Sequence, residues 1–363
     1  GYLGRTPTPS PIDSSDIPAN SIDASKIIDG AIAVADVADN AITEAKIADA
    51  AVVSLKSGRK NLIINGDMQV SQRGDYTSAT TAVNANYYLD RHQANFAGVT
   101  TTVQHTDVTI NGIDKKALRV AATSTATGFI ASYQPIEFIN LQVGETYIVS
   151  CFVRSNNPNT RFRHDSMGGV SGADSPAFTN DGNWEKVSWV LDSTGTVGNI
   201  NIYVLSYNSG NVSITTGDYI EFTELQLEVG SVATDFEHRS YGEELALCQR
   251  YYQAYGRASS GTPFRVVGSG NGGNTMLTGF LFQEKMRSAP TIAYYGGGST
   301  SGSWNNYTNG TATSNSSSTV TADVGDSSVR WNFAGNGSNP GSAYWIDVGI
   351  GGSQLGFTLD AEL

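Results

Sequence analysis

A repeat of ten residues near the N-terminus constrains this chain more than any other feature of its sequence. Each unit carries two apolar anchors, which fall on a strict period of five: Ile17, Ile22, Ile27, Ile32, Val37, Ile42, Ile47 and Val52. With a period of five, the anchors would not stay on one face of a helix, and they would not stay on one face of a flat strand. A thin, winding path of this kind buries its anchors only by stacking on neighbouring units or on other chains. We therefore expect residues 11–60 to form a fibre shaft in which identical chains, three by preference, share an apolar seam.

A helix is the alternative for this segment, because alanine, a good helix former, is frequent in it. A coiled coil would need a heptad of apolar residues. The segment has a period of five instead, which favours the shaft.

The composition indicates a β-rich protein of two or three domains. The 363 residues include 40 glycines, and only 15% are charged, which is typical of short strands joined by many turns. The net charge of -12 argues against binding to nucleic acid or to an anionic membrane. No apolar run is long enough to span a bilayer. Cys151 and Cys248 lie in apolar patterns, so we expect buried free thiols and folding in a reducing cytoplasm.

The segment 61–239 alternates apolar and polar residues with a period of two, as expected for strands with one face on a core. The strands that we expect are 100–105, 116–121, 128–135, 145–154, 184–191, 199–207 and 218–228. Turns rich in Gly, Asn, Asp and Pro separate them, and this pattern predicts a β-sandwich.

Specific strings at the two ends of this segment resemble a known family. They are NLIINGDMQVSQRG (61–74) with YYLDRHQ (87–93), and QLEVGSVATDFEHRSYGEELALCQRYYQ (226–253). Together they look like the jelly-roll, carbohydrate-binding-module-like domain of bacteriophage tail fibres. The decapeptide repeat, the opening GYLGRTPTPS, the later EKMRSAPTI and the terminal LDAEL match the order in such fibres, particularly in those of cyanophages and other phages of marine bacteria.

The resemblance implies a homotrimeric virion protein that is made in the host cytoplasm. Residues 1–10 would attach to a phage tail or baseplate protein. The distal β domains would bind host-surface polysaccharide or lipopolysaccharide without catalysis, with no nucleic acid and no membrane insertion. Three weak sites held together would gain avidity.

The resemblance also implies a structural calcium ion between the first and last strands of the jelly roll, held by oxygen ligands. The candidate ligands are Asp67 with Glu224 or Glu228. A plain Asn65-Gly66-Asp67 turn with acids facing solvent is the alternative.

Residues 240–257 are expected to form a linking helix. Ser240 and Glu243 have the spacing of a capping box. We expect Tyr251, Tyr252 and Tyr255 to pack between subunits rather than to bind sugar.

The last segment, 258–363, is expected to be a β tip that binds the receptor. Its expected strands are 264–268, 276–282, 291–295, 318–324, 329–333, 343–349 and 356–362. A long polar loop holds the candidate glycan-binding residues, where aromatic rings would stack on sugars and amides would bind hydroxyls: Trp304, Asn305, Asn306 and Tyr307. The aromatic residues of the later strands are assigned to a core: Trp331, Tyr344 and Trp345.

A search for catalytic motifs finds no HExxH, GxSxG, Walker or CxxC pattern, and the histidines are scattered. A glycan-cleaving enzyme needs only two nearby acids. The candidates for such a pair are Asp165, Asp174, Asp181 and Glu185, or Asp323 with Asp326. We therefore expect a binding protein and not an enzyme, with a polysaccharide depolymerase tailspike and a purely architectural virion appendage as alternatives.

Overall fold

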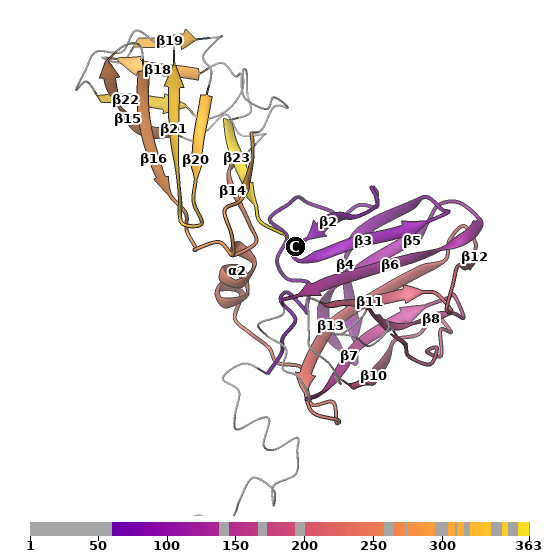
Figure 1. Cartoon of the computed structure of the whole chain (residues 1–363). Helices are drawn as coiled ribbons and strands as arrows, with labels where there is room; N and C mark the ends of the chain where they lie inside the picture. The colour runs from indigo at the N-terminus through magenta and orange to yellow at the C-terminus, as the bar shows by residue number, and fades with distance from the viewer. Residues whose placement is uncertain are drawn as a thin grey trace, which may run out of the picture.

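The computed structural model describes residues 60–137, 145–165, 173–192, 200–257, 265–272, 275–294, 304–308, 311–315, 320–334, 343–347 and 355–362. In these ranges the protein is mainly β, with one helix (Figure 1). The attachment segment and the decapeptide repeat lie outside the described residues, so the shaft and its trimeric seam stay predictions. None of the described helices is both long and apolar enough to cross a membrane.

Two antiparallel sheets make up the sandwich. The first has the order β1-β4-β5-β13-β7-β10, and the second has the order β2-β3-β6-β11-β8-β9 with β12 paired to β6. The strands of the first sheet are β1 (Thr80–Thr81), β4 (Thr101–Ile110), β5 (Ile113–Ala122), β7 (Thr146–Ser155), β10 (Glu185–Asp192) and β13 (Tyr219–Val229). Those of the second are β2 (Asn86–Leu89), β3 (His92–Ala97), β6 (Ala126–Ile136), β8 (Thr160–His164), β9 (Ala173–Asp174), β11 (Ile200–Ser206) and β12 (Val212–Ile214).

Alternate residues of both sheets meet in one apolar core, which includes Ile130, Val149, Ile202, Phe222 and Leu227. This confirms the predicted β-sandwich, and each strand expected between residues 100 and 228 corresponds to an observed one. The sequence did not predict the short strands β1, β2, β3, β8, β9 and β12. Cys151 and Cys248 are buried free thiols, as expected.

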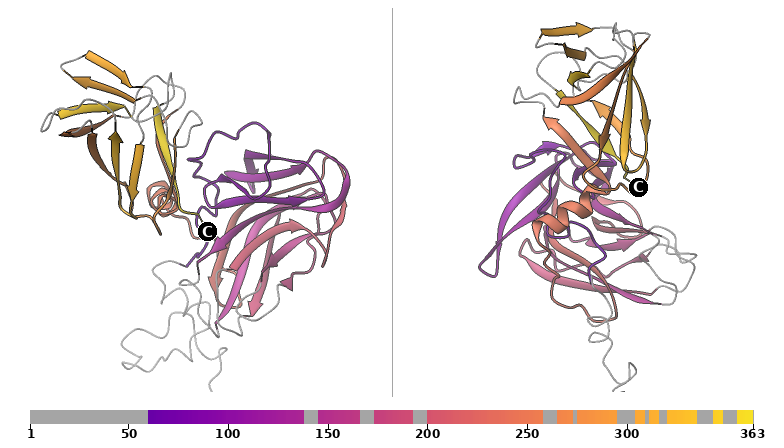
Figure 2. Two further views of the ribbon diagram at one scale, coloured as in Figure 1. Left: turned by 45° about the horizontal axis from the view of Figure 1, so that its top comes forward. Right: turned by 90° about the vertical axis from the view of Figure 1, so that its left-hand side faces the viewer.

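Helix α2 (Tyr241–Gln249) follows the sandwich and lies between it and the last strands (Figure 2). Ser240 caps it and forms the predicted capping box with Glu243. The predicted helix beyond Arg250 is wrong. The chain instead continues as strand β14 (Tyr252–Arg257), because its backbone pairs with β23 (Leu355–Asp360) near the C-terminus.

The tip contains two sheets, with the orders β14-β23-β17 and β19-β18-β22-β15-β16-β21-β20. The remaining strands are β15 (Arg265–Gly272), β16 (Thr275–Leu281), β17 (Thr291–Tyr294), β18 (Trp304–Thr308), β19 (Thr311–Asn315), β20 (Val320–Val324), β21 (Ser328–Ala334) and β22 (Ala343–Asp347). Trp331 packs with Tyr255 and Phe357 in the core of the tip, which confirms its predicted role. Tyr344 and Trp345 lie on β22, but their side chains are outside the described part.

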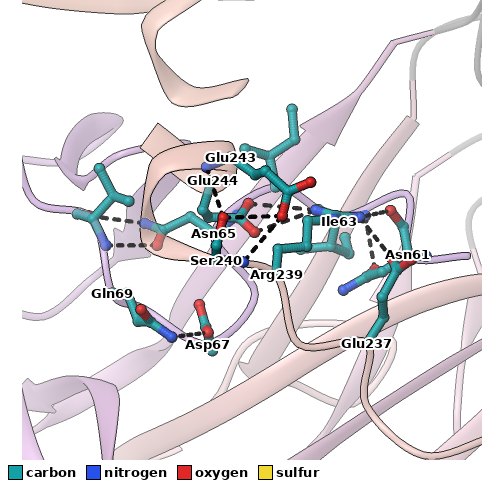
Figure 3. A network of polar contacts seen from close by, with 12 residues as sticks. Asn61, Ile63, Asn65, Asp67, Gln69, Glu237, Arg239, Ser240, Glu243 and Glu244 are labelled. Carbon is teal, nitrogen blue, oxygen red and sulfur yellow. Dashed lines mark hydrogen bonds and ion pairs between the residues drawn. The ribbon is translucent and has the colours of Figure 1, made fainter. Parts of the chain in front are cut away.

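The start of the sandwich is tied to its end by a polar network around Arg239 (Figure 3). The guanidinium of Arg239 donates to the carbonyl oxygens of Ile63 and Asn61 and pairs with Glu237 at 3.0 Å. The backbone N–H of Asn65 donates to the Glu244 carboxylate on α2. Gly66 passes so close to β13 that a Cβ there would lie 2.2 Å from the Leu225 carbonyl oxygen. The NGD string therefore serves as a close-packed turn that joins the first segment to the last strand and the helix.

The sandwich also holds the tip through two arginines. Glu362, after β23, pairs with Arg73 at 2.9 Å and with Arg91, whose side chain is only 1% exposed. The guanidinium carbon of Arg91 lies 3.6 Å from the ring centroid of Tyr251, and that of Arg73 lies 3.9 Å from the ring centroid of Tyr252. These tyrosines pack within the chain, so their predicted packing between subunits is wrong.

We predict that Glu362→Gln lowers the free energy of unfolding by about 3 kcal/mol, because it leaves the buried Arg91 cation without its carboxylate. Urea unfolding measures the change. Asp323→Asn is the control, since the Asp323–Arg330 ion pair is exposed and should contribute less than about 1 kcal/mol. Equal effects of the two substitutions would contradict the role of Glu362.

His92 is a buried titratable group beside this junction. Its Nε2 lies 3.0 Å from the Asn65 carbonyl oxygen, and the side chain is fully buried. Burial lowers the pKa of His92 from its ordinary value of 6.5 to about 4. The neutral imidazole therefore contributes fully to the stability of the folded state above pH 6.5, and this contribution is lost as the pH falls towards 4.

We predict that the free energy of unfolding falls between pH 7 and pH 4 in both the native chain and the His92→Gln variant. The fall should be about 3 kcal/mol larger in the native chain. Glutamine keeps a donor for the Asn65 carbonyl but does not titrate. Urea unfolding at both pH values measures this difference, which separates the imidazole from the carboxyl groups that titrate in the same range. Equal pH slopes for the two proteins would refute the assignment.

Candidate functional site

The middle strand β6 carries large side chains on both of its faces. Ile130 and Ile136 point into the sandwich core, and Gln134 bonds inward to the backbone of Ile64. Because successive residues of a strand point to opposite faces, Phe129 and Tyr133 lie on the outer face of the sheet. Neither belongs to the core, and both are half-buried.

The outer face of the second sheet has a continuous row of side chains across five strands. Gln93 of β3 is paired with Tyr133 of β6, Tyr133 with Tyr203 of β11, Tyr203 with Arg163 of β8, and Arg163 with Asp174 of β9. The ring centroids of the two tyrosines are 4.7 Å apart, and their planes are tilted by 33°. We call this outer surface the aromatic face.

A second pair of rings lies further along β6 and directly after the end of β11. Phe129 and Tyr207 pack edge to face with their centroids 6.2 Å apart. Each is four residues from a tyrosine of the first pair, or about 13 Å at 3.3 Å per residue. Ala131 and Leu205, opposite each other between the two pairs, are buried although they lie outside the core, which indicates that the larger side chains around them cover this face.

Polar groups hold the rings in place. Asp165 Oδ2 accepts hydrogen bonds from the Tyr203 hydroxyl at 2.8 Å and from Asn201 Nδ2 at 2.7 Å. Arg163 pairs with Asp174 at 2.7 Å. Gln93 Oε1 is buried and has no hydrogen-bond partner within the described ranges. The face thus combines ordered acceptors and cations with a free acceptor at one end of the row.

Both tyrosines of the first pair stay neutral over the usual pH range. Burial raises the pKa of Tyr133, and the nearby Asp165 carboxylate raises it further. Burial and the hydrogen bond to Asp165 raise the pKa of Tyr203. Each ring therefore presents an uncharged π face with a hydroxyl at its edge.

Chemically, this face suits a flat ligand that carries hydroxyl groups. Aromatic planes accept C–H groups, while Asp165, Gln93 and Arg163 offer acceptors and donors at the edges. Because neighbouring groups already hold the rings, a ligand would find the surface largely preformed.

The predicted glycan-binding residues Trp304, Asn305, Asn306 and Tyr307 lie on strand β18, which pairs with β19 and β22. Their predicted placement in a loop is therefore wrong, since backbone pairing on both sides extends the segment. Their side chains are outside the described part, and their role stays a prediction.

The structure brings together two of the predicted metal ligands. Asp67 and Glu224 line one hollow, whereas both oxygens of Glu228 accept hydrogen bonds from Thr234. Glu224 pairs with Lys115. Within the described ranges no three His, Cys, Asp or Glu side chains are grouped so that they could hold a metal ion. The calcium site thus remains a prediction.

The carboxylates that were candidates for a catalytic pair lie in different places and have different bonding partners. Asp165 and Asp174 lie on the aromatic face, where other side chains bind both. Asp181 accepts a hydrogen bond from the Asn183 side chain, and Glu185 accepts one from the backbone N–H of Asn180. In the tip, Asp323 and Asp326 pair with different cations, Arg330 and Lys285.

We did not predict the aromatic face from the sequence, although a signal for it exists. In FIASYQP (129–135) and IYVLSY (202–207), tyrosine or phenylalanine occupies the phase of the alternation that does not face the core. A half-solvated sheet ordinarily has polar residues there. Aromatic residues in the outward phase of two strands thus mark a candidate binding face.

Comparison with solved structures finds weak similarities. This chain resembles the enzymatically active domain of bacteriophage CBA120 tailspike protein 4, with 12% identity and a TM-score of 0.31. The match covers 47% of this chain and 21% of the tailspike chain. The chain also resembles the CBM22-1 xylan-binding domain of Paenibacillus barcinonensis Xyn10C, with 12% identity and a TM-score of 0.29 over 44% of this chain and 99% of that one. A third similarity is to TmCBM61 in complex with β-1,4-galactotriose, with 13% identity and a TM-score of 0.27 over 47% of this chain and all of that one.

The matched region spans about a fifth of the tailspike chain. No protein-family model and no curated protein matches this chain. At these identities and TM-scores the likenesses carry no functional argument, which therefore rests on the aromatic face.

Proposed function

We propose that the sandwich binds a glycan on the aromatic face without cleaving it, and that it does so within a homotrimeric phage tail fibre. The observation that carries the binding proposal is the register that sets Tyr133 beside Tyr203 on the outer side of the sheet. A pyranose ring has C–H groups on one face and hydroxyls around its edge. The tyrosine rings can stack against the C–H groups, and Asp165, Gln93 and Arg163 can form hydrogen bonds with the hydroxyls.

The fibre part of the proposal rests on the sequence. The period-five anchors need a shared seam, and the strings at residues 61–74 and 226–253 resemble phage tail fibres. In such a virion protein, the N-terminal segment attaches to a tail or baseplate protein, and the ligand is host-surface polysaccharide or lipopolysaccharide. Three copies of a weak face on one fibre gain avidity when they bind the same cell.

The bonding of the acids supports binding without catalysis. Glycoside cleavage uses a carboxylic acid that donates a proton and a second carboxylate that acts as nucleophile or base. On the aromatic face, Asp174 is ion-paired with Arg163, and Asp165 is hydrogen-bonded to Tyr203 and Asn201. Both acids thus serve to position their neighbours.

We predict that Tyr203→Ala and Tyr133→Ala each weaken glycan binding about tenfold or more, since each removes one stacking ring. The full chain is screened on an array of bacterial surface glycans, and dissociation constants are then measured by calorimetry. Tyr219→Ala is the matched control, because Tyr219 is a half-buried tyrosine of the other sheet that stacks under Arg119.

Unchanged affinity in both face variants would contradict the assigned face. Shortening of the bound polysaccharide over hours would contradict binding without cleavage and favour the depolymerase. A chain that binds no glycan and no cell would favour a purely architectural role.

A further inference from the structure

A hollow of about 480 Å³ lies on the sandwich away from the aromatic face, in the size range of small-ligand pockets. Its lining comes from the β4–β5 hairpin, strand β13, the turn at Asp67 and the start of α2. None of the side chains of the aromatic face takes part. The hollow is therefore a separate place where a ligand can bind.

A bulge in β13 shapes one wall. The pairing of β13 with β7 shifts register between Thr223 and Gln226, and Glu224 has a φ of 52°. Such left-handed backbone is unfavourable for a residue with a side chain. The Glu224 carboxylate is held almost buried by Lys115 and lies 3.8 Å from His238. Bulges of this kind redirect side chains beside functional sites.

Two buried polar atoms of the lining lack a hydrogen-bond partner among the described residues. They are Asp67 Oδ1 and Thr223 Oγ1. Asp67 is 8% exposed, Thr223 is fully buried, and each unpaired polar group costs about 1–3 kcal/mol. Hydroxyl groups of a ligand would satisfy both, because a hydroxyl donates to the carboxylate and both donates to and accepts from the threonine.

Two exposed apolar side chains complete the lining. Tyr241, the first residue of α2, is 54% exposed, and Ile113, in the hairpin, is 60% exposed. A tyrosine ring beside unsatisfied acceptors is the combination that a sugar ring requires. Acids outnumber lysines in the lining, with Asp67, Asp107, Asp114 and Glu224 against Lys115 and Lys116. The ligand is therefore neutral or amino-bearing rather than anionic.

We propose that this hollow is a second sugar site, which takes one or two units of a neutral or amino sugar. The sugar ring packs on Tyr241, and its hydroxyls bond to Asp67, Thr223 and Glu224. The site does not depend on the aromatic face, so either can fail without the other. Two sites on one sandwich would let each chain of a fibre bind a branched or long glycan at two points.

The test uses the full chain and saturation-transfer NMR with the methyl glycosides of glucose, galactose, mannose, glucosamine and N-acetylglucosamine. Affinities are taken from titrations. We expect at least one probe to bind, and we expect Thr223→Val and Tyr241→Ala to weaken it about tenfold or more. Tyr203→Ala, on the other sheet, should leave this binding unchanged.

Thr223→Val keeps the shape of the side chain and removes an unpaired hydroxyl, so thermal unfolding should show an equal or higher melting temperature. Loss of sugar binding in a fully folded variant therefore reports on the site. Binding of no probe, or equal binding by both hollow variants and the native chain, would overturn the proposal. Calcium chloride binding that depends on Asp67, without glycoside binding, would overturn it in favour of the metal site.

Discussion

The pairing of β6 with β11 is the interaction on which the candidate function depends. It sets Tyr133 opposite Tyr203 on one side of the sheet, and on the other side it directs Ile130, Ile202 and Val204 into the core. A slip of one residue would exchange the two sides and bury the tyrosines. The apolar core therefore also fixes the aromatic face, because the free energy of burying isoleucine and valine selects the register that brings the rings together.

The remaining contacts make the sandwich and the tip one connected structure. Arg239 ties the first segment of the sandwich to its last, and Arg73 and Arg91 bind Glu362 across the junction with the tip. Buried arginines of this kind are costly unless every partner is present. The tip is thus linked to the sandwich by charged contacts.

Much of the fold follows from local patterns, and the site does not. Clean alternation predicted β4, β7 and β13, and the Ser240–Glu243 spacing predicted the start of α2. The helix was extended too far because Tyr252–Arg257 becomes a strand only through its distant partner β23. Strands β2 and β3 were missed because the polar run Asp90-Arg91-His92 interrupts the apolar alternation, although the fold buries all three side chains. The aromatic face depends on the register between strands about 70 residues apart, which the sequence does not reveal.

A crystal structure of the full chain with the oligosaccharide that it binds most tightly is the most direct test of the central claim. We expect a sugar ring stacked on Tyr133 and Tyr203, with hydroxyls within hydrogen-bond distance of Asp165 or Gln93. An oligosaccharide bound at the tip instead, with the aromatic face empty, would contradict it.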